Sequence, residues 1–171
     1  VTHTNGDSWW YFTRTTAGLE YPRFCRIPGA DRDDIPDVEQ PHPDEEVLLD
    51  LNLEAEGHEF LSLGWAEVSP TGNRLAYSLD TSGDERYDLW IRDLTTRSTL
   101  DGPITGVGAG GSWLGEEWIF YNRVDAAWRP FQAWRHRVGV SGDVLVLEEA
   151  DESFWLGLSG SRDRNWVVID L

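Results

Sequence analysis

Apolar and smaller or polar side chains alternate in the middle of the chain. Residues 74–79 follow this period of two, which is typical of a β-strand, and residues 89–91 form a second apolar stretch. Turn-forming residues at 70–73 lead into the first stretch, and a polar turn at 80–84 leads out of it. Both faces of each predicted strand carry apolar residues. The pattern therefore predicts two strands joined by a turn and buried on both sides, as in small sheets stacked face to face.

The same pattern recurs along the chain. The strand pattern at 74–78 has counterparts at 117–121 and 165–169, and an earlier copy lies at 8–13, followed by a strand pattern at 23–26. The later copies are spaced by roughly forty to fifty residues, which is typical of the four-stranded blades of a β-propeller. The first copy lies further from the second, which indicates an insertion.

The repeats predict an all-β fold, a partial β-propeller of about three and a half four-stranded antiparallel blades. The chain is divided into a first blade at 1–52 with an acidic insertion at 28–46, a second blade at 58–102, a third blade at 104–149 and the start of a fourth blade at 153–171.

Composition narrows the classes of function. The chain has 171 residues, and its 31 acidic and 14 basic residues give a net charge of −17, which argues against binding nucleic acid or an anionic membrane. Its single cysteine, Cys25, has no partner for a disulfide within the chain. No apolar run is long enough to span a bilayer and no signal-peptide pattern begins the sequence, so a cytoplasmic location is expected.

The sequence contains no methionine, and its last strand pattern, at 166–171, has no following turn or partner strand. We therefore expect a fragment of a longer protein. A truncated propeller leaves blade faces uncovered. Aromatic groups at 9–12 and 166–169 are expected to be exposed, with self-association as a consequence.

Several local motifs resemble sites that carry chemistry. The insertion at 28–46 is rich in carboxylates, but it lacks the spacing of a calcium loop, so a solvated loop is favoured over a calcium site. A single helical turn is expected at 53–56, with Asn52 as its N-cap. The glycine run at 106–111 matches G-x-G-x-x-G, but a strand follows it where a dinucleotide site needs a helix. Packed glycines of an inner strand are favoured.

Nucleophilic and metal chemistry are not favoured either. Ser112 lacks the second glycine of a nucleophile elbow, because position 114 is leucine, and a structural role is preferred. The four histidines form no metal-binding motif, and His136 is expected to be packed or hydrogen-bonded. We therefore predict no catalytic residue, no cofactor and no metal site.

Six segments carry a family signal: YFTR at 11–14, EYP at 20–22, EEVLLDLN at 45–52, VSP at 68–70, DTSGDERY at 80–87 and RPFQAWRH at 129–136. In this order they resemble the N-terminal propeller of the prolyl oligopeptidase family, and within it the oligopeptidase B branch. The resemblance runs along essentially the whole chain. It implies a seven-bladed propeller that caps a C-terminal α/β-hydrolase domain, restricts entry to it, and belongs to a serine peptidase that cleaves short peptides after Arg or Lys. The family's catalytic triad lies on that other domain, so this chain should be inactive alone.

Two functions from different classes remain open. One is the non-catalytic, substrate-gating domain of such a peptidase, with the hydrolase domain and short basic peptides as partners, and the other is a stand-alone propeller that binds a protein or peptide without chemistry. The equivalent turns at 81–87 and 124–130 are predicted to share one face and to contact the neighbouring domain or a charged peptide. The predicted contact residues are Asp84, Glu85, Arg86, Asp125 and Arg129. The alternative is local ion pairs on a wet surface.

Overall fold

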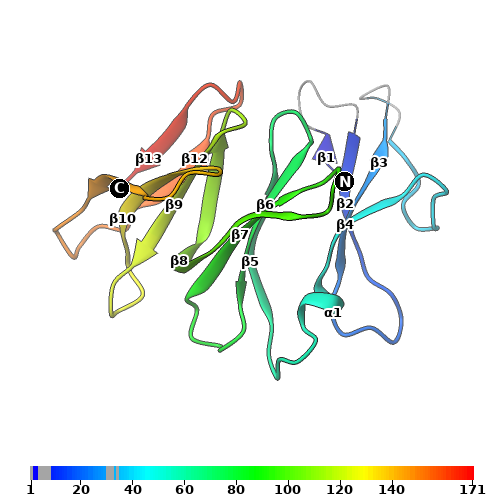
Figure 1. Cartoon of the computed structure of the whole chain (residues 1–171), viewed down its shortest axis with the longest axis horizontal. Coiled ribbons are helices and arrows are strands. Elements are labelled where there is room, and N and C mark those ends of the chain that lie inside the picture. The colour runs from blue at the N-terminus through cyan, green and yellow to red at the C-terminus, as the bar shows by residue number, and fades with distance from the viewer. Residues whose placement is uncertain (1, 4–8, 30–32, 34) are drawn as a thin grey trace. The chain divides into compact units, whose positions relative to one another are not determined.

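The computed structural model describes residues 2–3, 9–29, 33 and 35–171, with the backbone alone for residues 2 and 3. The chain divides into two compact units, residues 1–59 and residues 60–171. Within the described residues, antiparallel strands make up the structure, together with one short helix (Figure 1). The predicted all-β class is confirmed.

The first unit contains a four-stranded antiparallel sheet in the order β1-β2-β3-β4. Its strands are β1 (Thr2–His3), β2 (Trp9–Arg14), β3 (Arg23–Pro28) and β4 (Glu46–Asp50). Alternation along β2 and β3 places Phe12, Cys25 and Ile27 in one buried cluster, and Val38 and Val47 pack against it. The sheet therefore has a small apolar core of its own.

A single helical turn, α1 (Leu51–Glu54), follows β4. The single helical turn was predicted at 53–56 and begins two residues earlier. Asp50 caps α1, and its side chain accepts a hydrogen bond from the backbone N–H of Asn52. The prediction of Asn52 as N-cap was wrong because its amide binds a distant backbone segment. Asn52 Nδ2 donates to the Tyr21 carbonyl over 2.8 Å, and its Oδ1 accepts from Tyr21 N over 3.0 Å.

The acidic insertion lies between β3 and β4 and has no regular secondary structure in its described part, residues 29, 33 and 35–45. It is more than a solvated loop, because Val38 packs against the core of the first unit. Arg14 also donates to the backbone carbonyls of Val38 and Gln40, over 3.1 and 3.3 Å. The sheet thus holds the loop by an apolar contact and by the partly buried Arg14 guanidinium.

The second unit contains a seven-stranded antiparallel sheet in the order β11-β10-β9-β8-β7-β6-β5, and a two-stranded sheet of β12 and β13 whose first strand contacts β8. The strands are β5 (Ser62–Val68), β6 (Arg74–Asp80), β7 (Tyr87–Asp93), β8 (Thr99–Leu114), β9 (Trp118–Val124), β10 (Pro130–Arg137), β11 (Val144–Glu148), β12 (Gly157–Gly160) and β13 (Val167–Asp170).

The long strand β8 belongs to two groups of four strands. Its first part pairs with β7, from Thr99 opposite Arg92 to Val107 opposite Tyr87, and its second part pairs with β9, from Val107 to Leu114. One group is therefore β5, β6, β7 and the start of β8, and the other is the end of β8 with β9, β10 and β11. Groups of four antiparallel strands agree with the blade pattern, and the exact blade limits stay predictions.

One apolar cluster in the core of the second unit is drawn from β6 to β9. Its buried members are Ala76, Tyr87, Leu89, Ile91, Val107, Trp113, Ile119 and Tyr121. The glycine run at 106–111 lies within β8, as predicted, and Gly111 lies so close to the Trp65 ring and to the Phe120 carbonyl that a Cβ would clash with both. Glycine is needed here for close packing and not for a phosphate.

The two ends of the described chain differ from each other. Trp10, Tyr11 and Phe12 are buried, so the expected exposure of residues 9–12 was wrong for these three. At the other end Trp166 is 69% exposed and Val168 is 46% exposed, as expected. No helix among the described residues is long and apolar enough to cross a membrane.

Candidate functional site

The predicted contact residues lie in two turns, one between β6 and β7 and one between β9 and β10. Asp80, buried at the end of β6, builds the first turn by accepting hydrogen bonds from the backbone N–H groups of Ser82, Gly83 and Glu85, at 2.8, 2.8 and 2.9 Å. Burial by itself would raise the pKa of Asp80, but these N–H donors outweigh it and lower the pKa. The ionised carboxylate therefore organises the turn that carries Asp84, Glu85 and Arg86.

The Asp125 carboxylate organises the second turn in the same way. It accepts from the backbone N–H groups of Ala127 and Arg129, at 2.8 and 3.1 Å, and from Arg129 Nε at 2.9 Å. Burial works against ionisation here too, but the Arg129 side chain and the two N–H groups lower the pKa of Asp125. The turn places Trp128 in the left-handed region, with φ of +61°, which is rare for a bulky residue.

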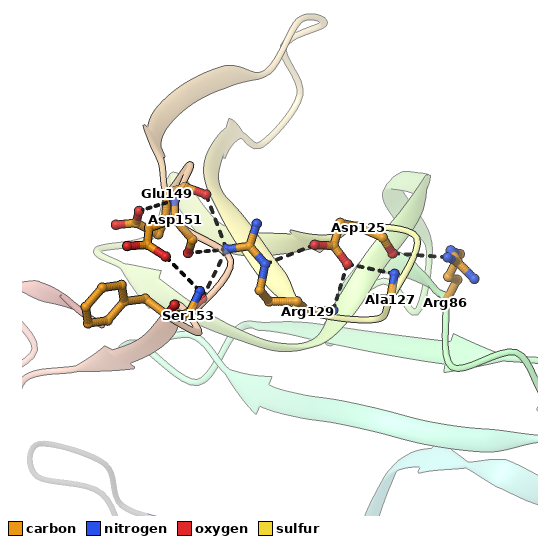
Figure 2. Close-up of polar contacts among 8 residues, drawn as sticks. Arg86, Asp125, Ala127, Arg129, Glu149, Asp151 and Ser153 are labelled. Atoms are coloured by element: carbon orange, nitrogen blue, oxygen red, sulfur yellow. Dashed lines mark hydrogen bonds and ion pairs between the residues drawn. The ribbon is translucent and has the colours of Figure 1, made fainter.

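Side chains of the two turns contact each other. Trp128 Nε1 donates to the carbonyl oxygen of Asp84 over 2.6 Å, and Arg86 Nη2 donates to that of Asp125 over 3.2 Å. The Arg86 guanidinium also lies 5.2 Å from the centre of the Trp128 ring, a cation–π distance. The structure therefore brings the two turns, and with them the five predicted residues, together at one edge of the second unit. Figure 2 shows three of the five, Arg86, Asp125 and Arg129.

Arg129 has an internal role that the sequence did not indicate. It is buried, and its Nη1 donates to the backbone carbonyls of Glu149, Asp151 and Phe154, at 3.3, 3.0 and 3.0 Å. Figure 2 shows its side chain pointing between the Asp125 turn and the segment that follows β11. Arg129 thus joins the Asp125 turn to the segment that follows β11. Because its guanidinium is buried, the charges that a partner could reach at this edge belong to other residues.

Sequence reasoning missed the aromatic residues beside these turns. Trp128, Phe154 and Trp155 are 47%, 46% and 62% exposed. A hollow of about 380 Å³ is lined by Asp125, Ala126, Ala127, Arg129, Glu152 and Trp155. A second hollow of about 260 Å³ is lined by Gly83, Asp84, Glu85 and Trp128. The run DESFW at 151–155, in which carboxylates adjoin two aromatic residues outside any strand pattern, was the available signal.

The surroundings of the candidate nucleophiles fit a structural role. Ser112 is buried, and its Oγ donates over 3.4 Å to the carbonyl oxygen of its neighbour Trp113. Burial raises the pKa of the Cys25 thiol to about 12, so it stays protonated at neutral pH. No group of three or more His, Cys, Asp or Glu side chains within the described part of the chain is placed to hold a metal ion.

His136 is buried and hydrogen-bonded, as predicted. Its Nδ1 lies 2.7 Å from Asp143 Oδ1, and its Nε2 lies 3.3 Å from Asp101 Oδ2. The Tyr121 hydroxyl donates to the other oxygen of Asp143 over 2.6 Å, and burial with this carboxylate raises the pKa of Tyr121. The cluster joins β8, β9 and β10 to the turn before β11.

Comparison with known proteins identifies the family. The model of the prolyl oligopeptidase N-terminal β-propeller domain matches residues 2–171. The chain belongs to this propeller family. The family match covers the strands, the turns and the segment that follows β11, so the features described above all lie within the propeller domain. The predicted resemblance is confirmed.

Relatives of the propeller are longer peptidases. The chain is 35% identical to Protease 2 of Moraxella lacunata over 164 residues, which is 93% of this chain and 23% of that protein. It is 32% identical to dipeptidyl aminopeptidase BI of Pseudoxanthomonas mexicana, over 95% of this chain and 24% of that protein. The chain thus spans about a quarter of the length of these relatives.

Solved structures agree with the family. Oligopeptidase B from Trypanosoma brucei, in a closed form with covalently bound antipain, superposes with a TM-score of 0.81 and 32% identity over 95% of this chain and 22% of that one. Oligopeptidase B from Leishmania major gives a TM-score of 0.82 and 28% identity, again over 95% of this chain and 22% of that one. The strand arrangement described here is therefore that of an oligopeptidase propeller.

Proposed function

We propose that this propeller is the substrate-gating domain of a serine oligopeptidase that cleaves short peptides after Arg or Lys. The observation that supports it is the family match, which covers nearly the whole chain while the chain covers about a quarter of its peptidase relatives. In this proposal the partner is a C-terminal α/β-hydrolase domain of the same longer, cytoplasmic protein. The propeller selects substrates by size, and the hydrolase domain performs the chemistry.

The surroundings of the candidate nucleophiles agree with a propeller that has no catalytic role. Acyl transfer needs a nucleophile activated by a base within hydrogen-bond reach. Ser112 donates instead to a backbone carbonyl, and the Cys25 thiol is fully buried. We therefore expect that the chain will not react with a serine-directed fluorophosphonate, and that Ser112→Ala will leave this result unchanged. Labelling that disappears in Ser112→Ala would contradict the assignment.

The gating function is tested with the longer protein and a length series. Internally quenched peptides of increasing length carry one Arg–X bond in the same local sequence, and a folded protein carries that sequence in an exposed loop. Gating predicts that kcat/KM falls with length and that the folded protein stays intact. Citrulline in place of Arg removes the charge and tests the specificity. Equal cleavage of the folded protein and the short peptide would overturn gating, and equal cleavage of the citrulline peptide would overturn the basic specificity alone.

A second candidate function is a propeller that binds a protein or peptide without chemistry. It is favoured by the exposed aromatic residues and carboxylates beside the two turns. The complete reading frame distinguishes the two functions. A G-x-S-x-G motif between a strand and a helix, downstream of this chain, supports the peptidase, and its absence supports the binding module.

A further inference from the structure

The edge that carries the two turns combines exposed aromatic rings with exposed carboxylates. We call it the acidic–aromatic surface and define it by Asp84, Glu85, Trp128, Asp151, Glu152 and Trp155, all of which are exposed. Exposed tryptophan side chains grouped at one edge are unusual on a soluble surface unless they contact a partner. The aromatic residues indicate that something covers this edge, and the carboxylates indicate its charge.

The basic residues nearby neutralise only part of this negative charge. The Arg129 guanidinium is buried and binds Asp125 and three backbone carbonyls. Arg86 lies over the Trp128 ring and forms an ion pair with Asp84, at 3.7 Å from Nη1 to Oδ2. Glu85 and Glu152 form no ion pair with other described residues of the chain. The surface therefore keeps an excess of negative charge.

Each hollow of this surface pairs a tryptophan with carboxylates. Trp155 lines the larger hollow with Glu152 and Asp125, and Trp128 lines the smaller one with Asp84 and Glu85. An ammonium or guanidinium group is attracted both by a carboxylate and by the face of an indole ring. In the smaller hollow this role is already taken within the chain, because the Arg86 guanidinium lies over the Trp128 ring and pairs with Asp84. The larger hollow, with Trp155 and Glu152, fits a cationic side chain of a partner better than it fits an anion or a neutral apolar chain.

We propose that the acidic–aromatic surface binds a free peptide through its Arg or Lys side chains, one of which enters the larger hollow beside Trp155 and Glu152. The net charge of −17 favours the approach of a cationic peptide. Asp80 and Asp125 fix the turns through their backbone N–H groups, so the hollows exist before the peptide arrives. The proposal goes beyond gating, because binding at this surface needs no catalytic domain.

The test is a titration of the full chain with a fluorescein-labelled peptide that contains two arginines, followed by fluorescence anisotropy. A matched peptide with citrulline at both positions keeps the shape and loses the charge. We expect binding of the arginine peptide that weakens with salt, and no measurable binding of the citrulline peptide. Equal binding of the two peptides, or binding of neither, would overturn the proposal.

Variants locate the site. Trp155→Ala removes one cation–π partner and should weaken binding by about two- to fivefold. The pair Glu85→Gln and Glu152→Gln should weaken it by a similar factor and flatten its salt dependence. Trp166→Ala and Glu117→Gln are the matched controls, since both residues are exposed outside this surface, and they should bind normally. Equal loss in the controls would show that the peptide binds elsewhere.

Measurements on the longer protein distinguish peptide binding at this surface from a contact between its two domains. If neither the chain nor the longer protein binds the peptide, and Trp155 is shielded from a soluble quencher only in the longer protein, the surface is a domain interface and the peptide proposal is wrong. Loss of size selection in the length series, with peptide binding intact, would overturn gating alone.

Discussion

The two units of the chain stabilise their sheets in different ways. In the first unit, Arg14 binds Glu45, Arg23 binds Asp50 and Arg26 binds Glu46, at 2.6, 2.8 and 2.6 Å. These pairs attach β4 and the residue before it to β2 and β3. In the second unit, a buried cluster of eight apolar residues spans four neighbouring strands. Ion pairs thus attach the last strand of the first unit to its neighbours, whereas an apolar cluster joins neighbouring strands of the second.

The difference follows from the size of the cores. A small sheet buries less of its surface than a large one, so each remaining contact carries more of its stability. Arg14 and Glu45 are only 14% and 11% exposed and bind each other through two hydrogen bonds, which makes this pair stronger than an ordinary surface pair. We therefore expect the stability of the first unit to depend on pH, and the stability of the second to fall most when a buried apolar side chain is shortened.

The largest effect is expected in the core of the second unit. Leu89 is 1% exposed, and Leu89→Ala leaves a cavity that should lower the free energy of unfolding by about 3 kcal/mol. Leu100→Ala, at a position 38% exposed in the same unit, is the control and should cost less than about 1 kcal/mol. Hydrogen exchange of peptides from residues 60–171 in urea measures both. Similar losses of stability in the two variants would show that the apolar cluster is not the main source of stability of the second unit.

Removal of the Arg129 side chain should have the next largest effect. Arg129→Ala leaves Asp125 and three backbone carbonyls without their donor, which should cost about 2 to 3 kcal/mol. The matched control is Arg137→Ala, whose pair with Glu117 is 49% and 60% exposed and is worth less than about 1 kcal/mol. Chemical unfolding monitored in the second unit compares the two, and equal losses would contradict the internal role of Arg129.

Acid should destabilise the first unit through Glu45. Hydrogen bonding to Arg14 is the main cause of its lowered pKa. Because the folded pKa is depressed, the contribution of Glu45 to stability is complete above the pKa of an unfolded Glu, about 4.3, and disappears as the pH falls through the lower folded value. Unfolding of residues 1–59, followed by hydrogen exchange between pH 6 and pH 3, should show this loss. Glu45→Gln should remove much of it, whereas the exposed control Glu20→Gln should not.

The smallest effect on stability is expected for charge reversal at Asp84. Its side chain is half exposed and accepts hydrogen bonds from the Ser82 hydroxyl and the Arg86 backbone N–H at the surface, so Asp84→Arg should lower the free energy of unfolding less than the changes above. If this edge contacts a domain or a basic peptide, the same change should alter kcat/KM for longer peptides in the longer protein. Asp125 is unsuitable for this test because it holds its own turn. Unchanged kinetics for Asp84→Arg would argue against the contact.

The sequence by itself determined the strands, their repetition and the family. Alternation at 74–79 and its copies predicted β6, β9 and β13, because the side chains of a strand point alternately to its two faces whatever the rest of the chain does. Local turn chemistry predicted the turns that carry Asp84 and Asp125, and their equivalence in the repeat predicted that they lie together. These features could be predicted because each depends only on residues close together in the sequence or on the repeated pattern.

Only the tertiary structure decided how individual polar and aromatic side chains are used. Asn52 binds the distant Tyr21 backbone and leaves the cap to Asp50, and Arg129 is buried by a segment twenty and more residues away. Trp10 is buried although it lies near the start of the chain, and Trp155 is exposed. Charge and hydrophobicity are properties of a residue, but burial and hydrogen-bond partners depend on which distant segments the fold brings beside it.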